Sequence, residues 1–311
     1  MLGYFAITDY DWFQFLAARP NLEEVNFWRP SDTRSPQQLV PGTPVIFKLR
    51  KRYEGWIVGY GVFAKHSVLP AWLAWDTFRE SNGAADFAQM RDRIERLRPA
   101  SGPAQRAGDY SIGCLMLSQP IFLPSNRWVS PPSDWPDNVV QGAGRDLLSG
   151  EAARVWDELV GATGHAAVTP SPGAIGEETP RYGNIGASRP RLGQGTFRIT
   201  VLDAYRACAV TGEHSLPALE AAHIRPFSDN GPRDVTNGIL LRSDVHRLFD
   251  RGYVGVSPDY TFLVSDKLHD DYKNGRSYFP LAGKPIALPQ NVHDHPSREQ
   301  LAWHMEQILR K

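Results

Sequence analysis

The chain has 311 residues, of which 41% are hydrophobic and 22% are charged, and its 34 basic and 34 acidic side chains cancel. This length predicts about two globular domains. The balanced charge excludes strong indiscriminate binding to polyanions, and the absence of an apolar run of about 18 residues excludes a membrane span.

The start of the chain lacks the basic residues and long apolar core of a signal peptide, so we expect a cytoplasmic protein. Its two cysteines, Cys114 and Cys208, lie far apart in the sequence. They are too few for a disulfide framework or for a four-cysteine zinc ribbon, so neither is expected.

The first 160 residues predict one α+β domain. Runs rich in β-branched and aromatic residues predict strands near residues 4–8, 41–49, 56–63 and 112–117. Apolar residues at helical spacing predict helices near residues 12–18, 84–98 and 147–160. Residues 161–190 are rich in Gly, Pro, Ser and Ala and poor in large apolar residues, a composition that predicts a flexible linker.

A second domain is expected over residues 191–311. Its first predicted element is a helix with Phe197, Val201 and Tyr205 on one face. The other predicted elements are strands at 219–224 and 239–241, a helix after Ser243, a hairpin over 253–264 and a closing helix at 296–310.

Three polar residues of this domain have the side chains needed to hydrolyse a phosphodiester. That reaction requires a base to activate water, a group to orient the base, and a metal ion to stabilise the leaving oxygen. His223 ends a predicted strand, Asn237 lies in the following loop, and His246 lies early on the next helix. We therefore predict His223 as general base, Asn237 as its orienting residue, and His246 as a metal ligand.

The motifs around these residues resemble the HNH endonucleases, specifically a subfamily common in restriction-type nucleases. They are Arg191-Leu-Gly-Gln-Gly-Thr-Phe-Arg198, Cys208-Ala-Val-Thr-Gly212, Glu220-Ala-Ala-His223, Asn237-Gly-Ile-Leu-Leu241 and Asp244-Val-His-Arg-Leu-Phe-Asp250. The resemblance implies a ββα-metal fold and a divalent metal cofactor, Mg²⁺ or alternatively Mn²⁺ or another transition metal.

The pattern departs from many HNH enzymes at Ala222, where those enzymes carry a metal-ligating Asp. A carboxylate must then come from another position, and Asp244 and Glu220 are the candidates. Arginines near these motifs are expected to contact the phosphates of DNA. They are Arg189, Arg191, Arg225 and Arg242.

Three short motifs of residues 1–160 are Asn26-Phe-Trp-Arg-Pro30, Pro41-Gly-Thr-Pro-Val-Ile-Phe47 and Ile57-Val-Gly-Tyr-Gly-Val-Phe63. In their order and spacing they resemble the PUA-like superfamily, with EVE and ASCH domains as the nearest members and SRA domains as relatives in shape. The resemblance implies a β-barrel with flanking helices that reads a modified base. Such a reader must flip the base from the stack and hold it between aromatic side chains. The residues predicted to bind DNA or the modified base are Trp28, Arg29, Trp56, Tyr60, Trp135, Asn138 and Gln141.

Three hypotheses follow. The first is a modification-dependent endonuclease that cuts double-stranded DNA near 5-methyl- or 5-hydroxymethylcytosine. The second is an HNH restriction nuclease whose first domain reads sequence or structure. The third is a nucleic-acid reader with an inactive HNH remnant, which Ala222 favours. A double-strand cut requires either a homodimer or two sequential visits to the DNA, because one active site cuts one strand.

Overall fold

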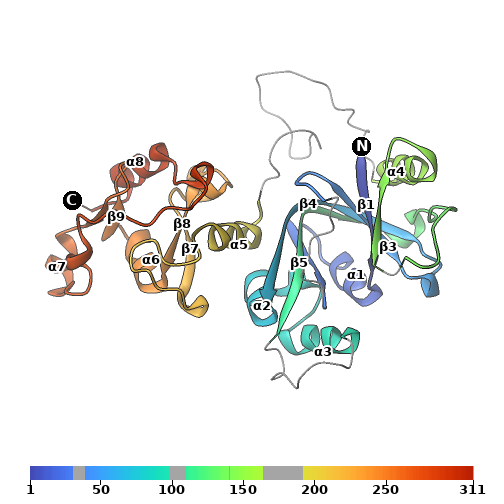
Figure 1. Cartoon of the computed structure of the whole chain (residues 1–311), viewed down its shortest axis with the longest axis horizontal. Coiled ribbons are helices and arrows are strands. Elements are labelled where there is room, and N and C mark those ends of the chain that lie inside the picture. The colour runs from blue at the N-terminus through green and yellow to red at the C-terminus, as the bar shows by residue number, and fades with distance from the viewer. Residues whose placement is uncertain (31–38, 99–109, 140, 164–191, 311) are drawn as a thin grey trace. The chain divides into compact units, whose positions relative to one another are not determined.

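The computed structural model describes residues 1–30, 39–98, 110–139, 141–163 and 192–310. The chain divides into two compact units, Met1–Pro190 and Arg191–Lys311 (Figure 1). Both units mix helices and strands, so the α+β class holds for each. The predicted phosphate contacts Arg189 and Arg191 lie outside the described residues, as does most of the segment predicted to be a linker.

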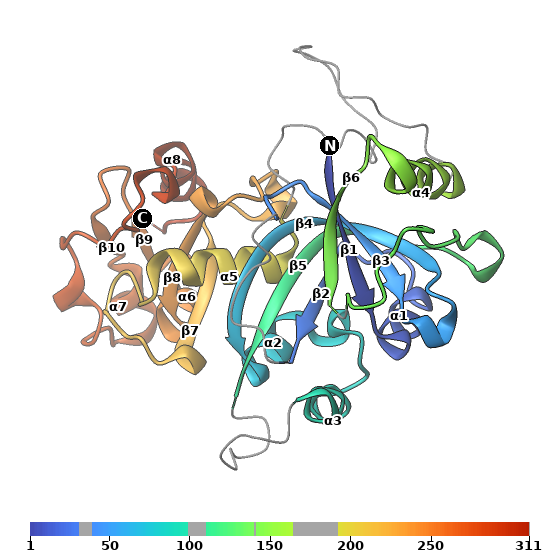
Figure 2. The same ribbon diagram turned by 45° about the vertical axis from the view of Figure 1, so that its right-hand side comes forward.

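One six-stranded sheet forms the centre of the first unit, and its strands appear in blue and green in Figure 2. Strands β1 and β3 pair in parallel, and the other neighbouring strands are antiparallel. The order across the sheet is β2-β5-β4-β3-β1-β6. The strands are β1 (Leu2–Thr8), β2 (Glu24–Arg29), β3 (Pro44–Leu49), β4 (Ile57–Pro70), β5 (Ser111–Phe122) and β6 (Gly142–Asp146).

This sheet is open among the described residues, because β2 and β6 are its two edges. The closed PUA-like barrel implied by the resemblance is therefore not present in this part of the chain. The pairing of β3 with the long strand β4 shifts register between Phe47 and Lys48, next to Gly59, which has φ +152°. A Cβ at Gly59 would strike the carbonyl oxygen of Ile121 on β5, so a side chain is excluded there.

Helices pack on the sheet through apolar stripes. They are α1 (Tyr10–Ala17), α2 (Ala71–Phe78), α3 (Phe87–Leu97) and α4 (Gly150–Ala162). Asp9 caps α1 by accepting a bond from the backbone N–H of Trp12, and Asp86 caps α3 by the same geometry at Gln89. Val155 and Leu159 of α4 pack into an apolar cluster that includes Phe5 of β1.

The second unit is built on two short antiparallel pairs of strands. They are β7 (Leu219–His223) with β8 (Gly238–Arg242), and β9 (Val254–Val256) with β10 (Phe262–Val264). The helices are α5 (Gln194–Tyr205), α6 (Ser243–Asp250), α7 (Lys267–Tyr272) and α8 (Arg298–Gln307). Buried Phe197, Ile239, Val245, Phe249 and Leu301 join these elements into one core.

In both units, no helix among the described residues has the length and hydropathy needed to cross a membrane.

Candidate functional site

The second unit brings the three predicted residues onto a strand, a turn and a helix that are contiguous in space. His223 is the last residue of β7, and it pairs with Gly238, the first residue of β8. Asn237 ends the 3-10 turn Val235–Asn237 immediately before β8. His246 lies in the first turns of α6, which begins directly after β8 and packs against both strands.

The imidazole of His223 is half-buried and lies flat on the ring of Phe197. The two ring centroids are 3.9 Å apart and the planes differ by 10°. Burial lowers the pKa of His223 below its ordinary value, and the charge of His246 lowers this pKa further. The charge of Asp250 opposes that effect without reversing it. A neutral imidazole is the form that accepts a proton, so this environment favours a base.

Asn237 is fully buried and holds the backbone of the loop after β7. Its Oδ1 accepts a hydrogen bond from the backbone N–H of Arg225 at 3.0 Å. Its Nδ2 donates to the carbonyl oxygens of Arg225 and Pro232 at 2.9 and 3.0 Å. Among the described residues the Asn237 amide therefore bonds to backbone groups of Arg225 and Pro232, in the loop after β7, and not to the His223 ring.

His246 lies between two carboxylates. Its Nδ1 is 2.7 Å from Glu220 Oε2, and its Nε2 is 3.4 Å from Asp250 Oδ2. Burial alone would lower the pKa of His246, but the bonds to Asp250 and Glu220 outweigh it and raise this pKa above its ordinary value. The two carboxylates therefore favour the protonated form of His246.

Imidazole nitrogen and carboxylate oxygens are donors that suit a divalent ion. Among the described residues, however, no three His, Cys, Asp or Glu side chains are arranged to enclose a metal. In this arrangement both ring nitrogens of His246 face carboxylate oxygens, so neither is open to a metal ion. Imidazole coordinates a metal ion in its neutral form, so protonation of His246 competes with metal binding.

The segment that contains these residues matches a known family. Residues 208–257, which include β7, β8 and α6, match the sequence model of the HNH endonuclease family. This segment is an HNH endonuclease domain. One solved structure, described as a modification dependent TagI restriction endonuclease, aligns with 93% of this chain and 77% of its own, at 13% identity and a TM-score of 0.30. The comparison with curated proteins gives no match.

Asp244 of the HNH domain is engaged away from His246. Arg242 donates two hydrogen bonds to its carboxylate at 2.6 and 2.8 Å, and the Tyr278 hydroxyl donates a third at 2.9 Å. The bond from Arg242 is the main reason that the pKa of Asp244 falls to about 2. Of the two carboxylates predicted as metal ligands, Glu220 contacts His246, whereas Asp244 forms a bridge with Arg242.

Sequence reasoning missed Asp250, which contacts His246 instead. The spacing could have predicted this contact, because residues four apart on a helix are neighbours on its surface. Asp250 is four residues after His246. The predicted phosphate contacts Arg225 and Arg242 are both partly used inside the domain. Arg225 donates from Nε to the carbonyl oxygen of Asp229 at 2.6 Å, and its guanidinium lies over Trp303.

The first unit contains a second candidate site, a half-open cavity of about 120 Å³. It brings together three of the predicted reader residues, Trp28, Arg29 and Gln141, which come from β2 and from the segment just before β6. The rest of its lining is Ile7, Asp9, Trp12, Phe27, Pro30, Arg50 and Leu97. Its volume is close to the ~150 Å³ of a cavity known to hold one benzene ring.

Hydrogen bonds hold some of the polar side chains that line this cavity, whereas others are exposed. The indole N–H of Trp28 donates to the carbonyl oxygen of Asn82 at 2.9 Å, and a guanidinium nitrogen of Arg29 donates to the Tyr4 hydroxyl at 2.7 Å. Both side chains are buried. Gln141 and Arg50 are exposed, so their polar ends are the adaptable part of the lining.

The other four predicted reader residues lie outside this cavity. Tyr60 is buried against Trp156 of α4, and burial raises the pKa of its hydroxyl. Trp135 packs on Phe5, with Lys48 Nζ 5.0 Å from its ring centroid. The other two predicted reader residues lie nearer the surface. Trp56 is partly buried and its indole N–H donates to Glu54, and Asn138 is exposed.

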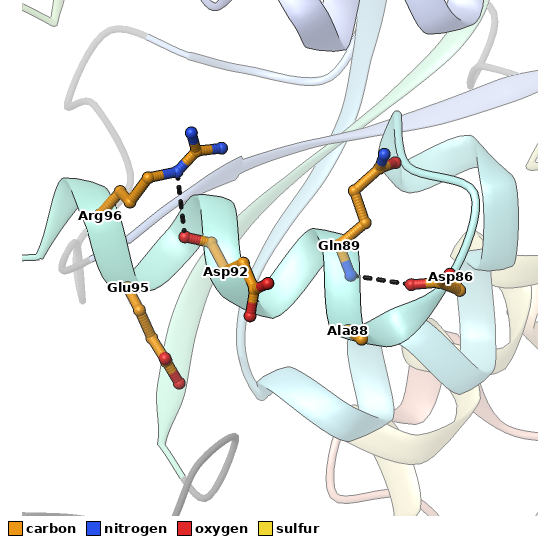
Figure 3. Close-up of a pocket in the computed structure, with 6 residues that line it drawn as sticks. All are labelled: Asp86, Ala88, Gln89, Asp92, Glu95 and Arg96. Carbon is orange, nitrogen blue, oxygen red and sulfur yellow. Dashed lines mark hydrogen bonds between the residues drawn. The ribbon is translucent and has the colours of Figure 1, made fainter.

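A broader surface hollow lies along α3 (Figure 3). Every residue that lines it is exposed, and all come from this helix or its N-terminal cap. Three of them, Asp86, Asp92 and Glu95, are acidic, and Arg96 Nε donates to the backbone oxygen of Asp92. Arg91 lies 3.2 Å from Asp92 and 3.8 Å from Glu95, so the charge of this surface is mixed.

Proposed function

We propose that this protein is a modification-dependent DNA endonuclease. Its first unit reads a modified cytosine, 5-methyl- or 5-hydroxymethylcytosine, that has been flipped out of duplex DNA. Its HNH domain hydrolyses a phosphodiester bond nearby. The observation that carries the proposal is the pair of unlike histidines: His223 stacks on Phe197, where burial lowers its pKa, whereas His246 lies between the carboxylates of Glu220 and Asp250.

His223 serves as the general base in this proposal. An ordinary histidine titrates near pH ~6.5, and the lowered pKa of His223 keeps it able to accept a proton at cellular pH. Asn237 fixes the loop that follows β7 and so fixes the end of the strand that bears His223. Its role is positional, because its amide bonds to the backbone.

His246, Glu220 and Asp250 would hold a divalent ion, Mg²⁺ or Mn²⁺, and Asp250 takes the place first assigned to Asp244. When bound, the ion supplies positive charge to the leaving oxygen and the crowded phosphate. Both carboxylates lie at ring nitrogens of His246 in the structure, so one nitrogen would have to exchange its carboxylate contact for the ion.

The cavity of the first unit is the proposed base-binding pocket. Flipping a base costs a few kcal/mol, and stacking on aromatic side chains recovers about 1–3 kcal/mol per base. Trp12, Phe27 and Trp28 supply the apolar wall. Asp9 is suited to accept from the exocyclic amino group of cytosine, while Arg50 and Gln141 are suited to donate to its ring nitrogen and carbonyl oxygen.

The test is cleavage of four DNAs of one sequence, carrying cytosine, 5-methylcytosine, 5-hydroxymethylcytosine or glucosylated cytosine, with Mg²⁺ or Mn²⁺. We expect metal-dependent cutting of at least one modified DNA and little cutting of the unmodified DNA. Equal cutting of all four would contradict the reader role and favour a nuclease that reads sequence or structure. Binding without cutting would favour a reader with an inactive HNH domain.

The variant His223→Ala tests the second half of the proposal. It should lose cleavage by a factor on the order of 10²–10⁴, the usual contribution of a general base, and should still bind the modified DNA. Full cleavage by this variant would show that the base is wrongly assigned.

A further inference from the structure

We propose that Phe197 and Gly238 together position His223 for proton transfer. This inference rests on the proposed function, since it assigns to these two residues the task of orienting the proposed general base. It also gives a role to Phe197 of the Gly-Gln-Gly-Thr-Phe motif at the start of α5 and to the glycine after Asn237, which the HNH pattern of His, Asn and His leaves unexplained.

The ring of Phe197 is the part of the protein that fixes the plane of the imidazole. Phe197 is only 2% exposed, and its helix α5 packs against both β7 and β8. Its ring lies nearly parallel to His223 at a centroid distance of 3.9 Å. Among the described residues, none forms a hydrogen bond with the His223 ring. The stack therefore fixes the ring while leaving its nitrogens available for water and the phosphate.

A second histidine in the same domain shows the contrasting arrangement. His304 stacks on Phe249 with almost the same geometry, 3.8 Å and 12°, but its Nε2 also lies 3.1 Å from the carbonyl oxygen of Phe249. That ring is 2% exposed and is held by a bond as well as by packing. His223 has the stack without that bond, as expected of a ring that must exchange a proton.

Gly238 provides the space that lets Phe197 lie flat on His223. It pairs directly with His223 across the two strands. Its backbone is ordinary extended chain, with φ −127° and ψ 145°, so its conformation does not require glycine. The space requires it, because a Cβ atom at this position would lie 2.4 Å from Val201 Cγ2 and 2.9 Å from Phe197 Cζ. A side chain at 238 must therefore displace Val201 and the Phe197 ring, or move the strand itself.

The first experiment compares Phe197→Leu with Ile199→Ala in the full-length protein. Leucine keeps an apolar side chain but removes the flat ring, whereas Ile199 is fully buried on the same helix and does not stack on His223. We expect Phe197→Leu to lower the single-turnover cleavage rate on modified DNA by 10- to 100-fold, the range that a misplacement of about 1 Å costs. Its dissociation constant for that DNA should stay unchanged, and Ile199→Ala should cut at the wild-type rate.

A readout without catalysis accompanies the kinetics. The carbon-bound imidazole proton resonances of His223, assigned by their loss in His223→Ala, lie in the shielding region of the Phe197 ring. They should move downfield in Phe197→Leu and in Gly238→Ala, and they should stay in place in Ile199→Ala. Unchanged resonances in both variants would overturn the positioning role, whatever the activity.

A double-mutant cycle separates positioning from general stability. If Phe197 acts through His223, then adding Phe197→Leu to His223→Ala should cause no further loss of rate. Independent, multiplying losses would overturn the proposal. Wild-type protein that cuts none of the DNAs would contradict the proposed function, whereas an inactive His223→Ala beside a fully active Phe197→Leu would contradict only the positioning role.

Discussion

The residue at position 222 determines which positions can supply a carboxylate to the proposed metal site. Ala222 is fully buried and pairs with Ile239 in the core of the second unit. An aspartate here, as in many HNH enzymes, would have to face the apolar core or rebuild the strand. Glu220 on the same strand and Asp250 on α6 lie beside His246 instead. In this chain the carboxylates therefore come from positions where they remain partly exposed.

It follows that Ala222→Asp should destabilise the protein and should not create a better metal site. We expect the free energy of unfolding to fall by about 3 kcal/mol or more, because an unpaired carboxylate would be buried. Urea unfolding at neutral pH measures this loss. The neighbouring change Ala221→Asp is the control, since Ala221 is only partly buried and its loss should be smaller. A stable Ala222→Asp variant with increased cleavage would contradict the claim that position 222 cannot hold a carboxylate.

Asn237 is the second residue whose role is decided by its hydrogen bonds. Asn237→Asp replaces the donating amide with a carboxylate facing the carbonyl oxygens of Arg225 and Pro232. We expect a loss of about 2–4 kcal/mol in unfolding free energy, from two lost hydrogen bonds and unfavourable contacts between oxygens. Chemical denaturation gives this value, and cleavage should fall in parallel. Asn237→Asp with wild-type stability would mean that the amide does not hold the loop.

Sequence reasoning could identify His223, Asn237 and His246 because their spacing and types are local features. It could not assign Phe197, which lies 26 positions before His223 and meets it only when α5 packs on the strands. It also placed Asp244 near the metal, because the sequence does not reveal that Arg242 and Tyr278 bind this carboxylate. Partner choice among nearby charges is a property of the folded domain.

At the scale of elements, α8 is anchored by a histidine that must stay neutral. Burial lowers the pKa of His304 to about 4, and its buried Nδ1 has no hydrogen-bond partner in the described part of the chain. In the unfolded chain the same group titrates near pH ~6.5. Between these values the unfolded state binds the proton more readily, so stability is complete above pH ~6.5 and falls as the pH drops toward 4.

The expected loss is about 3 kcal/mol of unfolding free energy between neutral pH and pH 4, from a shift of roughly 2.5 units at 1.36 kcal/mol per unit. Urea unfolding at a series of pH values measures it. His304→Gln has no titrating ring. Its unfolding free energy should therefore lose about 3 kcal/mol less than that of the wild-type protein between neutral pH and pH 4. Equal pH dependence in both proteins would show that His304 is not the group responsible.

Helices with a clear helical spacing of apolar residues, and strands with a continuous apolar run, were predictable from the sequence. The helices expected near 84–98 and 147–160 lie at Phe87–Leu97 and Gly150–Ala162, and the strand pair that carries His223 was expected at the positions where it occurs. Strand β6 was missed, because its sequence Gly-Ala-Gly-Arg-Asp lacks β-forming residues. The parallel pairing of β1 with β3 could not be read from the sequence, since it depends on tertiary packing.

At the scale of the whole molecule, we propose that the first unit selects modified DNA and that the second unit cuts it. Asp9→Asn keeps a residue type that caps α1 but removes the negative charge from the cavity, and Gln141→Ala changes an exposed side chain. Either should reduce the preference for modified over unmodified DNA by roughly 10-fold, about the 1–3 kcal/mol of one good base contact. The cleavage rate at saturating DNA should stay unchanged.

Competition between labelled modified and unmodified duplexes in one tube measures this preference directly. The control is Glu54→Gln, an exposed change outside the cavity lining. A loss of cleavage rate with intact preference in the Asp9 or Gln141 variants would place these residues in cutting and not in reading.

Helix α3 presents charges of both signs, and one of its residues, Leu97, lines the cavity of the first unit. Asp86, Asp92 and Glu95 lie in the surface hollow of Figure 3, and Arg91 is within ion-pair distance of both Asp92 and Glu95. A duplex that approached from the α3 side would therefore meet carboxylates that arginine already neutralises. The remaining attraction or repulsion is screened beyond roughly 8 Å at physiological ionic strength. The orientation of a duplex on this unit should therefore depend little on α3.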